Sequence, residues 1–365
     1  MEDYSNRKKI CIVCSKLNGG GAEKASAMQS IMFHNLGYEV TIVTVDSGVS
    51  FNYKGKVFDL GQFKNKKDTP IRRISRLVKL KRFLNKNNFQ YIVDNRPRNQ
   101  TYREIIITKF IYTSPTIYVI HSFEESTAFT KYRTINKWLY KNEIMVCVSR
   151  LGRQKFEKLY GLSNIKTIYN AFDFKEINRL SQNGSDVLDK EKYIIYCGRL
   201  NDRAKNLRLL LESYKISQLK ENSIKLLLLG DGEDLDVLKN YSEVLGISNN
   251  VVFKSFTKNP YPYIRKAMFL TLSSRSEGFA MVIPEALSLS TPVVSVDCNA
   301  GPKEIIKNRY NGLLVKNFDP KQLAAGFNMF VEDKELYNKC LGNSVSSVSK
   351  FTVEKITNDW KELLS

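Results

Sequence analysis

Two glutamates eight residues apart have the types and spacing that best suit chemistry on a ligand. Glu277 comes before Gly278, and Glu285 comes after Pro284. Because proline is favoured in the first turn of a helix, the pattern predicts a loop at Glu277 and a helical first turn at Glu285. The loop amides of residues 278–280 and the helix end can face an anion, and Glu285 can accept two hydrogen bonds from a ribose diol. The spacing also fits a Glu285 that only balances the helix dipole and a Glu277 that is a surface charge.

Two cations follow a predicted strand. Gly198 and Arg199 come directly after residues 193–197, and Lys205 lies six residues further on. Glycine lets the backbone approach a ligand, while the arginine fork and the lysine point charge both suit a diphosphate. The sequence is equally consistent with two cations that are exposed to solvent and bind no ligand.

A glycine run marks the first turn of the chain. Gly19, Gly20 and Gly21 lie between a predicted strand and a predicted helix over residues 23–36. The run is neither a Walker A motif nor the G-x-G-x-x-G fingerprint, since Lys24 stands at the third glycine position. It permits close approach to a sugar or phosphate, and a plain tight turn is the alternative.

The elements that must position these residues alternate between short apolar strands and helical segments, which indicates an α/β, doubly wound fold in both halves. The predicted strands are residues 10–14, 40–45, 91–94, 116–120, 143–148, 193–197, 225–229, 250–253, 269–272 and 292–296. The polar residues 181–186 are the expected linker. The predicted domains are 1–182, 187–345 and a carboxy-terminal helix in 346–365 that packs back toward the first domain. Ligands of such sheets bind beyond the carboxyl ends of the strands, so two facing domains predict a central cleft.

The net charge and the composition limit the classes of binding partner and the cellular location to expect. The 365 residues carry a net charge of +20, of which +17 falls in residues 1–180. This asymmetry predicts an anionic partner, namely nucleic acid, a membrane leaflet or a phosphorylated substrate. No nucleic-acid module is recognisable, which argues against nucleic acid. The chain shows neither a secretory leader nor a membrane span, so we expect it in the cytoplasm. The six cysteines lie mostly in apolar runs, which predicts buried reduced thiols.

A basic segment runs from Lys64 to Lys86, with ten lysines and arginines and one acid. After Pro70 its apolar residues recur at helical spacing. The most exposed side chains should be Arg72, Arg73, Arg76 and Lys79. Such a helix either touches an anionic membrane or packs on the first sheet with a solvated basic face.

The motifs together resemble one family, the retaining, two-Rossmann-domain glycosyltransferases of family four with the GT-B fold. That family includes phosphatidylinositol mannosyltransferases and many bacterial surface-polysaccharide enzymes. The matching elements span nearly the whole chain: Gly19-Gly-Gly-Ala-Glu-Lys24, Cys147-Val-Ser149, Tyr169-Asn-Ala-Phe-Asp173, Gly198-Arg-Leu with Lys205-Asn206, Gly230-Asp-Gly232, Glu277-Gly-Phe with Glu285-Ala, Pro292-Val-Val, Gly301-Pro-Lys-Glu304 and Asn311-Gly-Leu-Leu-Val315.

The resemblance implies roles for single residues. Arg199 and Lys205 would neutralise the donor diphosphate, Glu285 would hold the ribose, and His121 would approach the donor sugar. Further donor contacts are implied at Gly20, Gly21, Gly198, Glu277, Gly278, Phe279 and Ala280. No metal or other cofactor is expected, because the two cations and the helix end replace it. The apparent metal motif Asp234-Leu-Asp236 is interpreted as surface.

The resulting expectation is a retaining glycosyltransferase. It would move a hexose or N-acetylhexosamine from a UDP-sugar to a lipid-linked saccharide, peripherally on the inner face of a bacterial membrane, in capsule, O-antigen or exopolysaccharide synthesis. The chain departs from the family at Ala280 and Ala171, where glycine is common, and at Ser290-Thr291, where glycine usually precedes Pro292. A nucleotide-sugar 2-epimerase of the same fold and a non-catalytic scaffold subunit are the alternatives.

Overall fold

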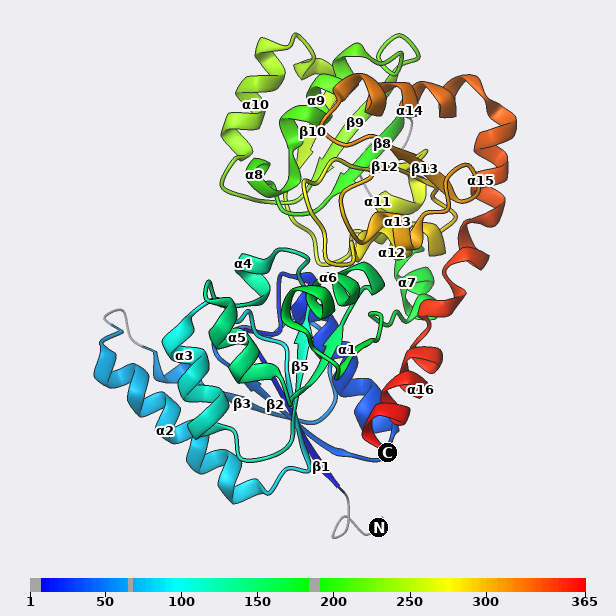
Figure 1. Cartoon of the computed structure of the whole chain (residues 1–365). Coiled ribbons are helices and arrows are strands. Elements are labelled where there is room, and N and C mark those ends of the chain that lie inside the picture. Colours follow the sequence, from blue (N-terminus) through cyan, green and yellow to red (C-terminus); the bar gives the residue numbers. More distant parts are fainter. Residues whose placement is uncertain (1–7, 65–67, 184–190) are drawn as a thin grey trace. The chain divides into compact units, whose positions relative to one another are not determined.

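The computed structural model describes residues 8–64, 68–183 and 191–365, and it divides into two compact units. The first unit comprises residues 1–171 and 353–365, and the second comprises residues 172–352. Each unit is an α/β sheet flanked by helices (Figure 1). The α/β doubly wound expectation for both halves is confirmed.

The first unit is built on a seven-stranded, all-parallel sheet of order β3-β2-β1-β4-β5-β6-β7. Its strands are β1 (Lys9–Cys14), β2 (Glu39–Thr44), β3 (Lys56–Asp59), β4 (Tyr91–Asp94), β5 (Thr116–Ile120), β6 (Ile144–Cys147) and β7 (Ile165–Thr167). In register, Ile10 lies beside both Val40 and Tyr91. The central strands are buried on both faces, which is why they appear in the sequence as continuous apolar runs.

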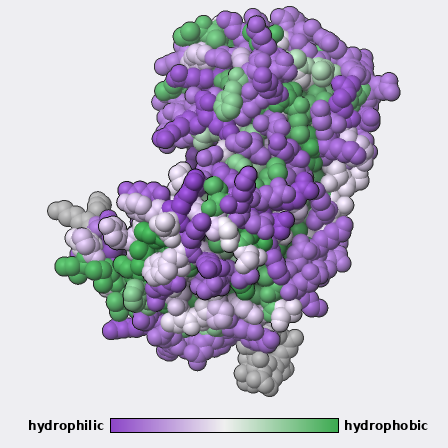
Figure 2. Space-filling view, in the orientation of Figure 1, coloured by the Kyte–Doolittle hydropathy of each residue, from purple (hydrophilic) through white to green (hydrophobic). Residues whose placement is uncertain are grey.

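Helices cover both faces of this sheet: α1 (Gly21–Asn35), α2 (Pro70–Asn87), α3 (Thr101–Ile106) with the π-helical turn η3 (Ile107–Ile111), α4 (Glu125–Ala128), α5 (Arg133–Tyr140), α6 (Arg150–Tyr160) and α16 (Val353–Leu364). Over α2 and α3 apolar side chains gather on the surface, as the green spheres in Figure 2 show. The chain returns to the first unit in α16, where Trp360 packs edge-on against Phe33 of α1 at 5.2 Å between ring centroids.

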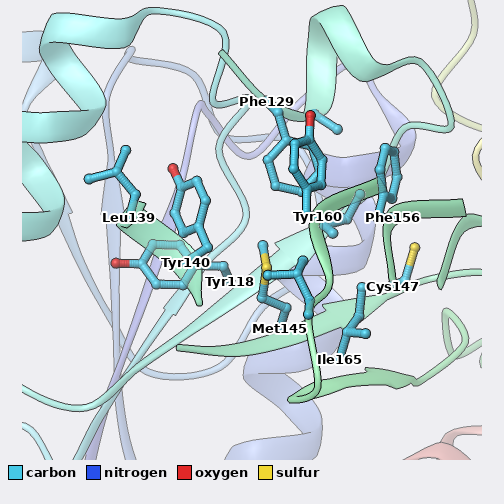
Figure 3. Close-up of a cluster of buried hydrophobic side chains, with 12 residues drawn as sticks. Tyr118, Phe129, Leu139, Tyr140, Met145, Cys147, Phe156, Tyr160 and Ile165 are labelled. Carbon is cyan, nitrogen blue, oxygen red and sulfur yellow. The ribbon is translucent and has the colours of Figure 1, made fainter. Parts of the chain in front are cut away.

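An aromatic core lies where α5 and α6 meet strands β5 to β7 (Figure 3). Phe129 is at its centre, with Tyr160 at 4.6 Å and Phe156 at 4.9 Å between ring centroids. A second core joins α2 and η3 to strands β1, β2 and β4 through Leu80, Leu84 and Ile107. Burial of these side chains fixes the helices on the sheet and leaves its carboxyl edge to the loops.

The second unit has a six-stranded parallel sheet of order β10-β9-β8-β11-β12-β13. Its strands are β8 (Lys192–Cys197), β9 (Ile224–Leu229), β10 (Val251–Lys254), β11 (Leu270–Leu272), β12 (Val293–Val296) and β13 (Gly312–Val315). Its helices are α7 (Phe174–Ser181), α8 (Asp202–Lys205), α9 (Leu207–Ile216), α10 (Leu235–Val244), α11 (Tyr261–Lys266), α12 (Val282–Ser288), α13 (Pro302–Ile305), α14 (Pro320–Glu332) and α15 (Lys334–Ser347).

The unit boundary differs from the one expected at residues 182–187. Helix α7 belongs to the second unit, because Ile177 is buried and Arg265 of α11 donates hydrogen bonds to Asn178 and Ser181. Of the polar residues 181–186 that suggested a linker, Ser181 is the last residue of α7. Residues 184–190 lie outside the described residues. The first unit carries 32 lysines and arginines against 16 acidic residues, so the basic excess lies in one unit.

Candidate functional site

The turn after β8 presents the first predicted cation. Arg199 is exposed, and its carbonyl accepts a 2.9 Å hydrogen bond from the buried Tyr196 hydroxyl. Two glycines that follow the next strand, β9, lie against this turn. A Cβ on Gly230 would lie 2.0 Å from the Gly198 carbonyl oxygen, and a Cβ on Gly232 would lie equally close to the Leu200 carbonyl oxygen. The Gly-Asp-Gly motif therefore holds the turn of Gly198 and Arg199 by close backbone contact.

Lys205 and Glu277 are brought into contact. The Lys205 ammonium lies 2.6 Å from Glu277 Oε1, and the Ser274 hydroxyl donates to the same oxygen at 2.6 Å. The side chains are 26% and 13% exposed, so the pair is largely withdrawn from water. As predicted, Glu277 lies in a loop, the one that follows β11. A cation and a carboxylate thus have fixed orientations at the carboxyl edge of the sheet.

Hydrogen bonds join the end of α8, which carries Lys205, to the loop that carries Glu277. The Ser273 hydroxyl donates to the Lys205 carbonyl at 2.8 Å, and the Arg275 amide donates to Ala204 at 3.0 Å. The Arg275 guanidinium also donates to Asn206 at 2.7 Å. The pair is therefore preorganised before any ligand arrives, as a charged site requires.

The backbone segment 278–280, whose amides were predicted to face an anion, ends at a residue with a strained conformation. Ala280 has a φ of 61°, in the left-handed region that costs an L residue roughly 1–2 kcal/mol. The Phe279 ring is buried and packs on Phe172 and Phe351 at 6.1 and 5.2 Å between ring centroids, which leaves only its backbone to face a ligand. Strained backbone of this kind is found at ligand clamps.

Glu285 lies in the first turn of α12, where the sequence places it, and its side chain is buried. It stands one helical turn before the end of a short helix whose other residues, apart from Ser288, are apolar, among them Ile283 and Leu287. The remaining predicted donor residues belong to the first unit. Gly20 is the N-cap of α1 and Gly21 its first residue, directly after β1.

His121 follows β5 and is held by a chain of side-chain hydrogen bonds. Its Nε2 lies 2.7 Å from Asn95 Oδ1, and Asn95 Nδ2 donates to Gln29 Oε1 at 2.7 Å. Because the Asn95 oxygen must then accept, His121 Nε2 carries the proton and Nδ1 keeps a lone pair. Burial, helped by the nearby Arg98 guanidinium, lowers the pKa of His121 to about 3. The ring is therefore neutral at physiological pH.

The polar run after β4 was missed from the sequence. Asp94 is fully buried and pairs with Arg96 at 2.7 Å, and Arg96 also reaches Glu104 at 3.4 Å. Arg98 is 1% exposed and donates to the Val119 carbonyl at 2.9 Å. The signal was present in the sequence: four polar residues and a proline follow a strand at the edge where His121 also lies. These residues position the β4 and β5 ends that carry Asn95 and His121.

The cation set predicted on α2 needs correction. Arg76 is only 13% exposed, because its guanidinium grips Asp68, which also accepts from Arg73 at 3.1 Å. Lys79 lies over the Phe63 ring at 3.7 Å. The predicted exposure is confirmed for Arg72, Arg73 and Lys79, and it is wrong for Arg76 alone.

Within the described ranges, no three His, Cys, Asp or Glu side chains gather as a metal site. The Asp234 carboxylate accepts the Asp202 amide at 2.7 Å, and Asp236 is exposed on α10. All six cysteines are free, and five are buried. Burial raises the pKa of Cys14 to about 12, so this thiol is inert.

The paired parallel sheets are shared with glycosyltransferases over almost the whole chain. HepE of Anabaena, solved with UDP and glucose, superposes with a TM-score of 0.78 at 19% identity and covers 98% of this chain and 99% of its own. A point variant of Staphylococcus aureus TarM, solved in a complex that includes UDP, gives 0.77 at 15% identity and covers 99% and 100%. These likenesses, together with the two sheets, define a GT-B fold.

Sequence comparison finds similarity to glycosyltransferases. Residues 179–344 match the family of glycosyl transferases group 1. An N-acetylgalactosaminyltransferase of Campylobacter jejuni that acts on N-acetylgalactosamine-N,N'-diacetylbacillosaminyl-diphospho-undecaprenol is 26% identical over 96% of this chain and 98% of its own. The amylovoran biosynthesis glycosyltransferase AmsD of Erwinia amylovora is 22% identical over 98% and 99%. The chain is thus similar over residues 179–344 to the group 1 glycosyltransferases, and over nearly its whole length to bacterial glycosyltransferases.

Proposed function

We propose that the chain is a retaining, metal-independent enzyme that transfers a hexose or N-acetylhexosamine from a UDP-sugar to a lipid-linked saccharide. The observation that carries this proposal is the preorganised pair of Lys205 and Glu277 on the same sheet edge as the exposed Arg199. The printed functions of the relatives support the acceptor class, since the Campylobacter enzyme acts on an undecaprenyl diphosphate saccharide. The UDP and glucose bound by HepE support the donor class.

The donor half of the mechanism follows from charge. As the bond from the sugar C1 to the diphosphate oxygen breaks, the electron pair leaves with the UDP. Arg199 and Lys205 stabilise that developing charge, so no divalent metal is needed. Glu285 accepts hydrogen bonds from the ribose, and Glu277 with the amides of residues 278–280 holds the sugar. The strained φ of Ala280 supports a ligand-facing role for these amides.

The acceptor half falls to the first unit. An acceptor hydroxyl attacks C1 on the face that the diphosphate leaves, and its proton passes to the departing diphosphate oxygen. His121 is neutral, and its Nδ1 lone pair can accept a sugar hydroxyl, which suits orientation of the donor sugar rather than proton donation. We infer that the enzyme works at the inner face of a bacterial membrane, in synthesis of a surface polysaccharide.

Product analysis tests the proposal. Incubation with radiolabelled UDP-sugars and an undecaprenyl-diphosphate saccharide should yield a labelled lipid and UDP. Arg199→Ala and Lys205→Ala should each slow this transfer by about 2–4 kcal/mol of barrier, the cost of losing one oxyanion donor. An epimerised nucleotide sugar would instead reveal a 2-epimerase, and an unchanged donor with every acceptor would indicate a scaffold subunit.

A further inference from the structure

A surface of the first unit exposes apolar side chains in a pattern that the fold does not require. We name it the α2–α5 apolar surface, and it consists of Ile71, Ile74, Val78, Tyr102, Ile106, Phe110 and Trp138. Tyr102 is 85% exposed and Ile71 is 79% exposed. In Figure 2 part of this surface is the green patch that lies where Figure 1 draws α2 and α3.

Helical spacing puts these side chains on common faces. Ile71, Ile74 and Val78 recur at intervals of three and four on α2, and Tyr102, Ile106 and Phe110 recur every four residues on α3 and η3. Helix α2 packs against η3, and Lys109 of η3 lies 5.1 Å from the Trp138 ring of α5. The three elements therefore form one continuous surface.

The concentration of these residues is unusual for a solvated face. Among the described residues, sixteen large apolar side chains are exposed, and eight of them fall between residues 71 and 138. Scattered exposed apolar residues are normal, whereas a contiguous patch marks an interaction site. Packing does not explain the stripe on α2, because that helix is anchored to the core by Leu80 and Leu84 instead.

The charges that α2, η3 and α5 expose beside this surface are basic, although Asp68 before α2 and Glu143 after α5 lie close to some of them. One turn beyond Val78, the exposed Lys81 and Arg82 continue the same side of α2. Lys109 and Lys137 are exposed next to Phe110 and Trp138. We call Lys81, Arg82, Lys109 and Lys137 the basic rim. Helices α2 and α5 contain no acidic residue, and the only acid of α3 and η3, Glu104, is fully buried.

We propose that the α2–α5 apolar surface inserts into the headgroup region of an anionic bilayer while the basic rim contacts lipid phosphates. Aromatic and aliphatic side chains flanked by lysine and arginine are the chemistry of an interfacial anchor, and tryptophan and tyrosine favour that depth. A second copy of the chain is the poorer occupant, because a symmetric dimer would bring the two basic rims together. No helix in the described part of the chain is long and apolar enough to cross a membrane.

The proposal deepens the proposed function, on which its biological purpose rests, since a lipid-linked acceptor lies in the same bilayer. It also corrects the expected contact set of Arg72, Arg73, Arg76 and Lys79. At 100° per residue those four occupy a different side of α2 from Ile71, Ile74 and Val78. Docking here depends on insertion as well as on charge.

The test measures partition of the full chain onto vesicles by co-sedimentation, with phosphatidylglycerol–phosphatidylcholine mixtures against phosphatidylcholine alone. Ile71→Ser, Ile74→Ser and Phe110→Ser combined should weaken partition about a hundred-fold or more at any salt concentration. Lys81→Gln with Arg82→Gln should weaken it about 25-fold at low salt and much less at high salt. Ile216→Ser, Val244→Ser and Val345→Ser combined are the matched control, because these side chains are similarly exposed on the second unit and should change nothing.

Tryptophan fluorescence gives a second readout. The chain has two tryptophans, of which Trp138 is 58% exposed and Trp360 is 2% exposed. Anionic vesicles should therefore shift the emission to the blue, and Trp138→Phe should remove the shift. A wild type that does not bind, a triple variant that binds like the wild type, or an unshifted emission would each overturn the proposal. So would conversion of a dimer to a monomer by the triple variant.

Failure of this proposal is distinguishable from failure of the proposed function. The triple variant should retain the wild-type affinity for UDP, since its substitutions lie outside the residues assigned to the donor. A chain that docks on vesicles and binds no UDP would sink the function and leave the docking standing.

Discussion

Lys205 and Glu277 touch, yet the proposed mechanism gives them opposite effects on the donor. Lys205→Met removes a cation from the diphosphate, whereas Glu277→Gln removes a carboxylate and keeps a hydrogen-bonding side chain of the same size. If the pair were only structural, both substitutions would lower stability and leave the affinity for UDP alone. If both residues act on the donor, the two variants should instead differ from each other in their affinity for UDP.

The structure gives the magnitudes. Exposed ion pairs contribute about 0–1 kcal/mol and breaking a buried pair costs about 3–5 kcal/mol, so a pair 26% and 13% exposed should lose about 1–3 kcal/mol on either substitution. A charged hydrogen bond to the diphosphate contributes about 1.5–3 kcal/mol, so Lys205→Met should weaken UDP binding roughly 10- to 150-fold. Glu277→Gln should leave UDP affinity unchanged or raise it, because one negative charge beside the phosphates is gone.

Urea unfolding measures the stability term, and isothermal titration with UDP measures the affinity. Transfer should fall in both variants, because Glu277 is assigned to the sugar and Lys205 to the leaving group. Ser274→Ala is the matched control: it removes the 2.6 Å hydrogen bond to Glu277 and keeps both charges, so UDP affinity should hardly change. Equal losses of UDP affinity in the Lys205 and Glu277 variants, or none in either, would refute the assignment.

Three further predictions follow from single contacts. The pKa of His121 falls from about 6.5 in the unfolded chain to about 3 in the fold, so the unfolded state binds more protons between these values. Stability should therefore drop by about 1–2 kcal/mol from pH 7 to pH 5, and His121→Gln should remove that slope in urea titrations at several pH values. Gly230→Ala should destabilise by about 2–4 kcal/mol, since its Cβ would meet the Gly198 carbonyl, whereas Gly342→Ala, with open space inside α15, should stabilise by up to about 1 kcal/mol; equal midpoints in thermal unfolding would speak against this. Transfer should survive EDTA, because Arg199 and Lys205 supply the positive charge, and a loss that Mg²⁺ or Mn²⁺ restores would argue for a metal-dependent mechanism.

The fold was largely predictable because its central strands are buried on both faces. Residues 10–14, 117–120 and 226–229 are unbroken apolar runs, and each lies within a strand. The strands that the sequence did not reveal, β3, β7 and β13, are all at sheet edges. Strands β3 and β7 are short and partly solvated, with exposed Lys56 and Lys166, so no apolar run marks them. Strand β13 does contain an apolar run, residues 313–315, which was interpreted only as part of a motif.

The candidate site was predictable where a backbone feature marked it. Gly278 and Pro284 located Glu277 in a loop and Glu285 in a helical turn, and the structure confirms both positions. The contact of Lys205 with Glu277 could not be predicted, because it joins residues 72 apart through the packing of two loops. Asn95 escaped notice for the same reason, since only the sheet order brings β4 and β5 together.

The α2 helix shows where periodicity is insufficient. Its apolar residues indicated one face, turned either to a membrane or to the first sheet, whereas the structure divides them between a core face at Leu80 and Leu84 and an exposed face at Ile71 and Ile74. The ion-pair partner of Arg76 could not be predicted from the helical pattern either, because Asp68 lies before the first residue of α2. Sequence reveals how often apolar residues recur, and the neighbouring elements decide which of them are covered.

Donor binding tests the central claim most directly. A thermal-shift screen of nucleotide sugars should identify a UDP-sugar that raises the unfolding midpoint. A hundred-fold excess over the dissociation constant adds about 2.7 kcal/mol to the native state, or roughly 5–10 °C for a unit of this size. The shift should shrink strongly in Arg199→Ala and Lys205→Ala at the same concentration. A wild type that no nucleotide sugar stabilises, or a shift that both variants keep in full, would contradict the account.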